Sequence, residues 1–440
     1  MKRKFYNQLI QWKNNNLGVP LMVIGARQVG KTYIIEKFCE ENFKNYYCLN
    51  FMKDKDFKQI FEQAGSFEKK VEILEAVIGV SLRNNKDTIL FVDEVQECES
   101  FIESLKFFNE SIDNFNIICA GSLLGVAVKR FKCSFPVGKV IIKYMYPLDF
   151  EEFLWATGNE RFVPYIRSSF LSNEKVPDLI HNTLIELYYK FLYLGGMPVV
   201  IDNFIKQKMN MSLIDNNLIK YIIEVYFDDM SKYASNLETI RIRNIYRSIP
   251  SQLAKENQKF MFSLVDEKDN RKRDYISALD WLIASKLVFL CNQVTKPEYP
   301  LNGFIDNDAY KIYLSDTGIL NSLLNISLKC YLLDQDFSYK GVITENYVAN
   351  ELIKMGYDLH YWSRKGKNNA NAEVDFLFQK DNKIIPVEVK AGKNTQAKSL
   401  KVYMEHYNAE YAIRLSINNF NLSNGVKDIP LYALFCSENV

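Results

Sequence analysis

The sequence predicts an α/β protein in which a doubly wound parallel sheet is followed by helices and by a smaller α/β module. Three observations support this fold class. Strand-like and helix-like patterns alternate from residue 20 to about 145, the pattern then becomes mainly helical, and charged strand-like segments return between residues 372 and 390. Because 440 residues are too many for one hydrophobic core, two to four domains are expected.

Composition narrows the class of protein. The formal net charge is +2, so no global field indicates a nucleic-acid partner. The eight cysteines are scattered without C-x-x-C spacing, which favours reduced core thiols, and the three histidines lie too far apart to suggest a zinc site. The basic start, Met1 to Lys4, is followed by polar residues, and no apolar run is long enough to span a bilayer. We expect a soluble cytoplasmic protein with no membrane partner.

The first domain is expected to contain a phosphate-binding loop between its first strand and a helix. The predicted strands are 21–24, 46–51, 88–92, 116–120 and 139–144. After the first strand the sequence runs Gly25-Ala26-Arg27-Gln28-Val29-Gly30-Lys31-Thr32. Glycines let the backbone N–H groups wrap around a polyphosphate, and the following helix adds its positive N-terminal end. In this pattern Lys31 reaches the β- and γ-phosphates of ATP, and Thr32 ligates Mg²⁺.

The third strand predicts the second half of an ATPase site. It is apolar and ends in Asp93 and Glu94. We expect Asp93 to hold Mg²⁺ through water and Glu94 to orient the attacking water. The alternative is a buried strand that ends in a solvated loop with two unrelated acids. Ser122, after the fourth strand, is placed to contact the γ-phosphate, as in P-loop ATPases with an additional strand, or to cap a helix.

The middle of the chain predicts a helical lid and then a winged helix. Helical patterns at 148–155 and 179–194 end at Gly195-Gly196-Met197-Pro198. Further helices lead to an amphipathic segment at 275–286 and an extended run at 287–294, an order that suits a winged helix.

Two basic clusters in this region could contact DNA phosphates. Their members are Arg241, Arg243 and Arg247 in one cluster and Lys268, Arg271, Lys272 and Arg273 in the other. Solvated helix faces with no nucleic-acid partner also look like this.

The charged strand pair between residues 372 and 390 predicts a second chemical centre. A hairpin with its turn midway sets Asp375 opposite Glu388 and Glu373 opposite Lys390, all on one face. An exposed cross-strand ion pair explains Glu373 and Lys390, whereas opposed carboxylates destabilise a sheet unless they share a proton or a cation. Oxygen ligands beside one lysine suit Mg²⁺ or Mn²⁺, which could activate a water while Lys390 orients it.

A helix upstream of the hairpin supplies a third predicted metal ligand. The pattern at 341–355 is helical, and Glu345 lies on the same inward face as Val348. A carboxylate pointing inward needs a partner, and the same metal could be that partner. After the hairpin, Gln396 opens another helix-like segment and could support Lys390.

This constellation resembles the PD-(D/E)xK nuclease superfamily. Asp375, Glu388 and Lys390 stand in its metal and lysine positions, and Glu345 stands in the position of its first-helix acid. The first half of the motif is Val-Asp here rather than Pro-Asp. The resemblance implies metal-dependent DNA cleavage, or retained metal binding after cleavage activity has been lost.

The whole chain resembles a prokaryotic AAA+-type ATPase family. In that family a P-loop domain precedes a C-terminal domain of unknown function that contains a winged helix and a restriction-endonuclease-like module. Besides the two nucleotide motifs, the resemblance rests on segments 120–125, 134–138, 146–154, 195–198, 313–318, 361–363 and 373–376. It implies a P-loop AAA+ ATPase core at 1–150, a helical lid at 151–205, a winged-helix-like domain at 206–330 and a nuclease-like domain at 331–440.

The resemblance also implies two finer contacts. Pro198 matches a glycine-x-proline element that touches adenine in related signal-transducing ATPases, although a simple turn after a helix explains it equally well. Many AAA+ proteins hydrolyse ATP between subunits with an arginine finger, for which Arg130 is the nearest candidate in a homo-oligomer.

Three function classes compete. The first is a DNA-associated ATPase whose C-terminal module cleaves or grips DNA, and the second is a nucleotide-operated switch or scaffold whose nuclease-like fold only binds DNA or protein. A small-molecule kinase also begins with a phosphate loop. It is disfavoured because Asp93 and Glu94 pair a metal ligand with a hydrolytic base.

Overall fold

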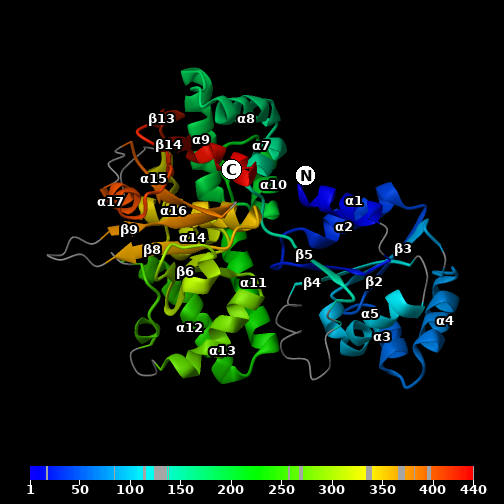
Figure 1. The fold of residues 1–440 in the computed structure, drawn as a ribbon. Helices are drawn as coiled ribbons and strands as arrows, with labels where there is room; N and C mark the ends of the chain where they lie inside the picture. The colour runs from blue at the N-terminus through cyan, green and yellow to red at the C-terminus, as the bar shows by residue number, and fades with distance from the viewer. Residues whose placement is uncertain are drawn as a thin grey trace. The chain divides into compact units, whose positions relative to one another are not determined.

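The computed structural model describes residues 1–15, 18–83, 85–111, 115–122, 136, 138–255, 258–266, 271–332, 339–364, 372–380, 382–393 and 398–439. It divides into two compact units, drawn in Figure 1. The first unit contains Met1–Tyr146 and Ala284–Lys286, and the second contains Pro147–Ile283 and Leu287–Val440. Among the described helices, none is both long enough and apolar enough to cross a membrane.

The first unit is built on a parallel sheet, as the sequence predicts. Its strand order is β2-β3-β4-β1-β5, and every neighbouring pair runs parallel. The strands are β1 (Leu21–Ile24), β2 (Asn45–Asn50), β3 (Thr88–Asp93), β4 (Asn116–Gly121) and β5 (Ile141–Tyr144). β4 lies between β1 and β3, which is the additional-strand arrangement that the sequence indicated.

Helices cover both faces of this sheet (Figure 1). They are α1 (Phe5–Asn14), α2 (Lys31–Asn42), α3 (Lys55–Glu62), α4 (Phe67–Ile78) and α5 (Glu99–Ser111). Alternate residues of the central strands, such as Leu90 and Val92, pack with Phe61, Phe67 and Phe101 of α3, α4 and α5. The intervening residues face the other side, because successive strand side chains point to opposite faces. Strands buried on both faces explain the continuous apolar runs in the sequence.

The second unit begins with the helices that the sequence predicted as a lid and a helical middle. They are α7 (Phe150–Ala156), α8 (Val163–Ser172), α9 (Asp178–Leu194), α10 (Pro198–Lys206), α11 (Asn217–Tyr233), α12 (Asn236–Leu253) and α13 (Lys272–Ala284). Asp149 caps α7: its side chain accepts the backbone N–H of Glu152, whose own side chain accepts the backbone N–H of Asp149.

Two sheets complete the second unit. One has the order β7-β6-β8-β9 and the other β10-β11-β12-β14-β13. The strands are β6 (Val288–Val294), β7 (Ile305–Leu314), β8 (His360–Arg364), β9 (Ala372–Val374), β10 (Phe376–Lys380), β11 (Lys383–Val389), β12 (Ala412–Ser416), β13 (Asn421–Ser423) and β14 (Val426–Pro430). The helices are α14 (Thr317–Leu323), α15 (Leu328–Leu332), α16 (Lys340–Lys354) and α17 (Lys398–Tyr407).

The strand pair predicted as the wing of a winged helix is part of a larger sheet. α13 is followed by the antiparallel pair β6 and β7, as the sequence suggested, but β6 also pairs in parallel with β8. One sheet therefore joins strands on both sides of the boundary expected near residue 330. The pairing depends on residues about 70 positions apart in the chain, which local patterns do not reveal.

A buried aspartate explains why two glycines end α9. Asp316 accepts the backbone N–H of Gly196 at 2.6 Å and that of Ile319 at 3.0 Å. A Cβ on Gly195 would lie 2.2 Å from Asp316 Oδ1, and a Cβ on Gly196 would lie 2.2 Å from the carbonyl oxygen of Leu148. The segments at 195–198 and 313–318 thus form one junction within the second unit.

Candidate functional site

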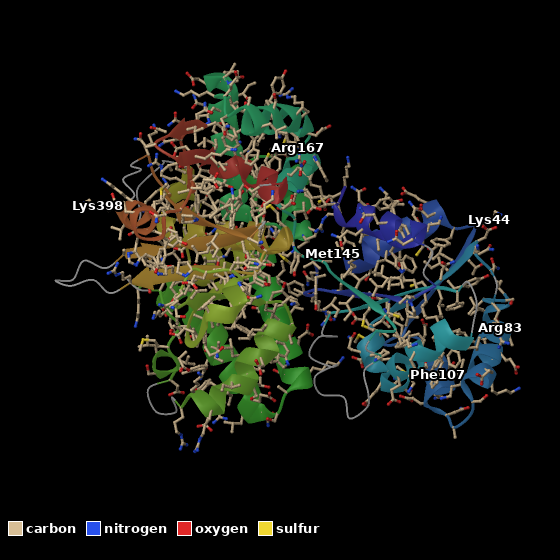
Figure 2. The ribbon with its side chains drawn as sticks, viewed as in Figure 1. Lys44, Arg83, Phe107, Met145, Arg167 and Lys398 are labelled. Carbon is tan, nitrogen blue, oxygen red and sulfur yellow. The ribbon has the colours of Figure 1, made fainter. Side chains whose placement is uncertain are left out.

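The phosphate loop lies between β1 and α2, at the carboxyl end of the central strands. Its backbone turns sharply, because Gln28 and Gly30 both have positive φ angles, 66° and 92°. A Cβ on Gly25 would lie 2.2 Å from the carbonyl oxygen of Met145, so only glycine fits there. Figure 2 labels Met145 on the segment that follows β5. The loop is thus held against the backbone that leaves the sheet.

Lys31 is buried at the start of α2 and folds back over the loop. Its ammonium group donates to the carbonyl oxygens of Gly25 and Ala26, at 2.8 and 2.9 Å. These contacts place a positive charge inside the turn, where a bound polyphosphate would need it.

Thr32 and Asp93 meet, although they are far apart in the chain. The Thr32 hydroxyl donates to Asp93 Oδ2 at 3.0 Å, which brings together the two residues predicted to hold Mg²⁺. Burial raises the pKa of the Asp93 carboxyl, and the neighbouring Glu94 raises it further. A buried carboxylate with a raised pKa gains from a nearby cation.

Asn50 is a site residue that the sequence reasoning missed. It ends β2 beside β3, and its amide lies 3.4 Å from Asp93 Oδ2. A polar residue at the carboxyl end of the neighbouring parallel strand was the available signal, because such ends meet at one edge of the sheet.

Glu94 follows Asp93 in a left-handed conformation, with a φ of 50°. Its carboxylate accepts a hydrogen bond from the Gln96 amide at 2.6 Å. Ser122 is buried directly after β4, between β3 and β1 in the sheet order. The polar residues predicted for the nucleotide site therefore end three adjacent strands, β3, β4 and β1.

Several predicted positions cannot be placed in this site. Pro198 begins α10 in the second unit, so its contact with adenine stays a prediction. The predicted residues outside the described part of the chain are Arg130, Lys268 and Gln396.

The C-terminal hairpin has the predicted register over most of its length. Phe376 pairs with Val387 and Lys380 with Lys383, so Asp375 and Glu388 occupy the next opposed positions. The Glu373–Lys390 pairing is wrong. The strand breaks at Asp375, and β9 pairs with β8, which sets Glu373 opposite Ser363 instead.

A buried lysine that the sequence reasoning missed forms ion pairs with two of the acids. Lys311 on β7 is 0% exposed, and its ammonium group lies 2.9 Å from Glu345 Oε1 and 2.8 Å from Glu373 Oε1. The Tyr313 hydroxyl also donates to Glu345. The helix α16 contacts both β7 and β11, which is how Glu345 comes to lie among these strands. The signal in the sequence was a lysine within an otherwise apolar strand.

Asp375 and Glu388 have one close ion pair between them, which Lys390 forms with Glu388. Asp375 Oδ2 accepts the backbone N–H of Val389 at 2.7 Å, and Glu388 Oε1 lies 2.6 Å from Lys390 Nζ. Burial raises the pKa of Asp375 well above its usual range, and Glu388 and Glu345 raise it further. Burial also raises the pKa of Glu388, against the opposing effect of Lys390.

The carboxylates fit a cation only in part. Glu388 is 4% exposed, and its Oε2 has no hydrogen-bond partner among the described residues, which leaves one oxygen free to bind a cation. Within the described residues, however, no group of three or more His, Cys, Asp or Glu side chains is arranged to hold a metal ion. Lys311 pairs with Oε1 of Glu345, so the joint binding of a metal ion by Glu345, Asp375 and Glu388 stays a prediction.

The described members of the basic clusters are engaged within the second unit. Arg243 donates to the carbonyl oxygen of Phe227 at 2.8 Å, and the guanidinium of Arg247 lies 4.8 Å from the Phe227 ring. Arg271 pairs with Asp274 at 3.0 Å. These contacts favour a structural role, and DNA contact by these residues stays a prediction.

Comparison with known families matches three segments of the chain. Residues 18–154 match the family described as AAA domain. Residues 185–329 and 340–434 match two families described as Domain of unknown function, DUF8612 and DUF4143. A search of curated proteins finds no match.

Solved structures show a looser likeness. The Walker-type ATPase PABY2304 of Pyrococcus abyssi is 14% identical, with a TM-score of 0.42 over 73% of this chain and 95% of that chain. The Aeropyrum pernix ORC2 protein in its ADPNP–ADP complexes is 12% identical, with a TM-score of 0.38 over 74% of this chain and 93% of that chain. Residues 18–154 match the AAA domain family, and they contain the parallel sheet and the phosphate loop described above.

Proposed function

We propose that the protein binds ATP with Mg²⁺ at the phosphate loop and hydrolyses it. The observation that carries this proposal is the 3.0 Å contact between Thr32 Oγ1 and Asp93 Oδ2. These are the two side chains that P-loop ATPases use around Mg²⁺, and they come from different elements. Thr32 and Asp93 would hold Mg²⁺, which would supply positive charge against the charge that develops during transfer.

Other residues of the site bind the phosphates and position the attacking water. Lys31 exchanges its loop carbonyls for the β- and γ-phosphates, and the N–H groups at the start of α2 face the same anion. Glu94 orients the attacking water. Before the water binds, the Gln96 amide holds the Glu94 carboxylate in place. Ser122 lies where a γ-phosphate contact is expected, directly after β4.

An ATPase assay tests the proposal. Lys31→Ala should abolish nucleotide binding, whereas Glu94→Gln should keep binding and lose turnover by about 100-fold or more. Lys37→Ala is the matched control, because this residue lies on the same helix and forms a partly exposed ion pair with Glu41. Normal ATP affinity in the Lys31 variant would overturn the proposal.

A second candidate activity is divalent-cation-dependent cleavage of DNA by the C-terminal hairpin. The free, buried Oε2 of Glu388 beside Asp375 favours it, since two carboxylates with raised pKa values gain from a shared cation. Asp375 and Glu388 would hold Mg²⁺ or Mn²⁺, and Lys390 would orient a water or stabilise the phosphorane. Glu345 could join them as a third ligand through Oε2, because Lys311 and Tyr313 contact its Oε1.

The test of cleavage uses supercoiled and branched DNA with Mg²⁺ or Mn²⁺, with and without ATP. Nicking should be lost in Lys390→Ala and retained in Lys398→Ala, whose side chain is exposed at the start of α17 (labelled in Figure 2). Nicking that survives Lys390→Ala would reject the site. No nicking under any condition would remove cleavage from the proposal.

The absence of cleavage would leave a nucleotide-operated switch or scaffold. The ion pairs of Lys311 favour this alternative, because they supply a cation to Glu345 and Glu373 without a metal. A switch predicts a change in oligomeric state or in DNA binding between ATP and ADP, measured by sedimentation and by DNA titration. Homo-oligomers with an arginine finger such as Arg130 belong to the same test.

A further inference from the structure

The N-terminal segment reaches the phosphate loop through Arg3. The side chain is buried, with 6% of its surface exposed, although it lies three residues from the start of the described chain. Its Nη1 donates to the carbonyl oxygen of Val29 at 2.9 Å, and its Nη2 donates to the carbonyl oxygen of Tyr146 at 2.6 Å. One guanidinium therefore bridges the phosphate loop and Tyr146, two residues after β5.

The helix α1 fixes Arg3 in this position. The Tyr6 ring packs edge-on against Phe38 of α2, with ring centroids 5.9 Å apart. The Tyr6 hydroxyl donates to Glu41 at 2.6 Å and accepts a hydrogen bond from the Asn42 amide at 2.8 Å. α1 is thus anchored to the helix that follows the phosphate loop.

The bond to Val29 reaches the most sharply turned part of the loop. Val29 lies between Gln28 and Gly30, both of which have positive φ angles. In such a turn, carbonyl groups that point outward leave the neighbouring N–H groups facing inward, toward the anion. Arg3 occupies the Val29 carbonyl, which belongs to the residue between these two positive-φ positions.

The bond to Tyr146 ties the same loop to the chain that leaves the sheet. Gly25 already packs against the carbonyl oxygen of Met145, and the Met145 N–H donates to the carbonyl oxygen of Ile24 at 2.8 Å. Met145 therefore contacts the loop directly at Gly25, and Tyr146 is linked to Val29 through Arg3.

We propose that Arg3 is a positioning residue of the nucleotide site. It keeps the phosphate loop in its binding shape and couples the loop to residues 145 and 146. This inference rests on the proposed ATP binding at the loop. Because a preorganised loop helps the bound substrate and the transition state alike, losing Arg3 should raise KM and leave kcat nearly unchanged.

The first experiment measures the affinity for a fluorescent ATP analogue and the ATPase kinetics. Arg3→Ala removes both hydrogen bonds and should weaken binding about tenfold or more, since each hydrogen bond from a charged group contributes about 1.5–3 kcal/mol and about 1.4 kcal/mol corresponds to tenfold in affinity. Arg3→Lys should recover part of the affinity, because its ammonium can donate to only one of the two carbonyls well. Lys2→Ala is the matched control for charge, since the Lys2 side chain is exposed in the same segment.

Hydrogen exchange supplies a readout that a merely stabilising residue would not change. In the wild type, ATP should protect the amides of residues 25–32 and of residues 145–146 together. In Arg3→Lys the loop should still gain protection, and residues 145–146 should gain less. If Arg3→Ala does not fold, this lysine variant carries the test.

The outcomes separate two failures. Wild-type protein that does not bind ATP would refute the proposed function. Wild-type protein that binds ATP, with Arg3→Ala within twofold of its affinity and unchanged coupling in Arg3→Lys, would refute only the role of Arg3. A fall in kcat at constant KM would also overturn it, because that result indicates a contact made only in the transition state.

Discussion

Glu351 should make the stability of the second unit fall as the pH rises. It is buried on α16, where its Oε2 accepts the backbone N–H of Phe150 at 3.2 Å and its Oε1 lies 3.1 Å from Lys354 Nζ. Burial raises its pKa from 4.5 to about 7, Lys354 opposes this shift, and Asp149 adds to it. The perturbation to test is Glu351→Gln, which removes the ionisation and keeps a hydrogen-bond acceptor.

The sign and size of the effect follow from this raised pKa. Below pH 4.5 the carboxyl is protonated in both states, so it adds no pH dependence. Between pH 4.5 and about 7 only the unfolded chain ionises, so stability is lost as the pH rises through this window. At 1.36 kcal/mol for each pKa unit, the loss amounts to about 3 kcal/mol at Glu351.

Urea unfolding from pH 5 to pH 8 measures this loss. Relative to the wild type, Glu351→Gln should gain about 2.5 kcal/mol across this range, because part of the loss already occurs below pH 5. Groups that titrate alike in both proteins cancel in the comparison. Glu405→Gln is the control, because this residue is exposed on α17 and its replacement should not change the pH profile. A difference between wild type and Glu351→Gln that stays constant from pH 5 to pH 8 would refute the reasoning.

Three further predictions concern other parts of the structure. Gly196→Ala places a Cβ 2.2 Å from a backbone oxygen and should cost about 2 kcal/mol or more in thermal unfolding, whereas Gly341→Ala, with nothing within 4 Å, should be nearly neutral. Thr32→Val should remove most of the Mg²⁺ dependence of ATP affinity, so that chelating Mg²⁺ with EDTA weakens nucleotide binding in the wild type far more than in the variant. Lys311→Met leaves two carboxylates without their cation and should cost about 3–5 kcal/mol. If Mn²⁺ can replace the ammonium group, it should raise the melting temperature of this variant more than that of the wild type.

The parallel sheet and the nucleotide motifs were predictable because their signals are local. Strands buried on both faces are apolar throughout, and a phosphate loop needs its glycines and lysine within eight residues. Arg3 gave no such signal. Its role depends on α1 packing against α2, which brings residue 3 to Val29 and Tyr146.

The hairpin shows where the period-two pattern of the sequence no longer predicts strand pairing. Alternation and the turn gave the register of β10 and β11, which pair as predicted from Phe376 to Lys380. Alternation fails one residue earlier, because the chain changes partner strands at Asp375 and β9 joins β8. Period-two reasoning places side chains only while a strand keeps one partner, and the sequence of the hairpin alone does not contain the competing strand.

The same change of partner explains what became of the predicted metal site. Opposed carboxylates need a cation, and the acids around the hairpin do receive one. For Glu345 and Glu373 it is the ammonium group of Lys311, which belongs to the chain and approaches from β7. Lys390 balances only one of the two remaining acids, Asp375 and Glu388, so any divalent cation that binds here should find its ligands in that pair.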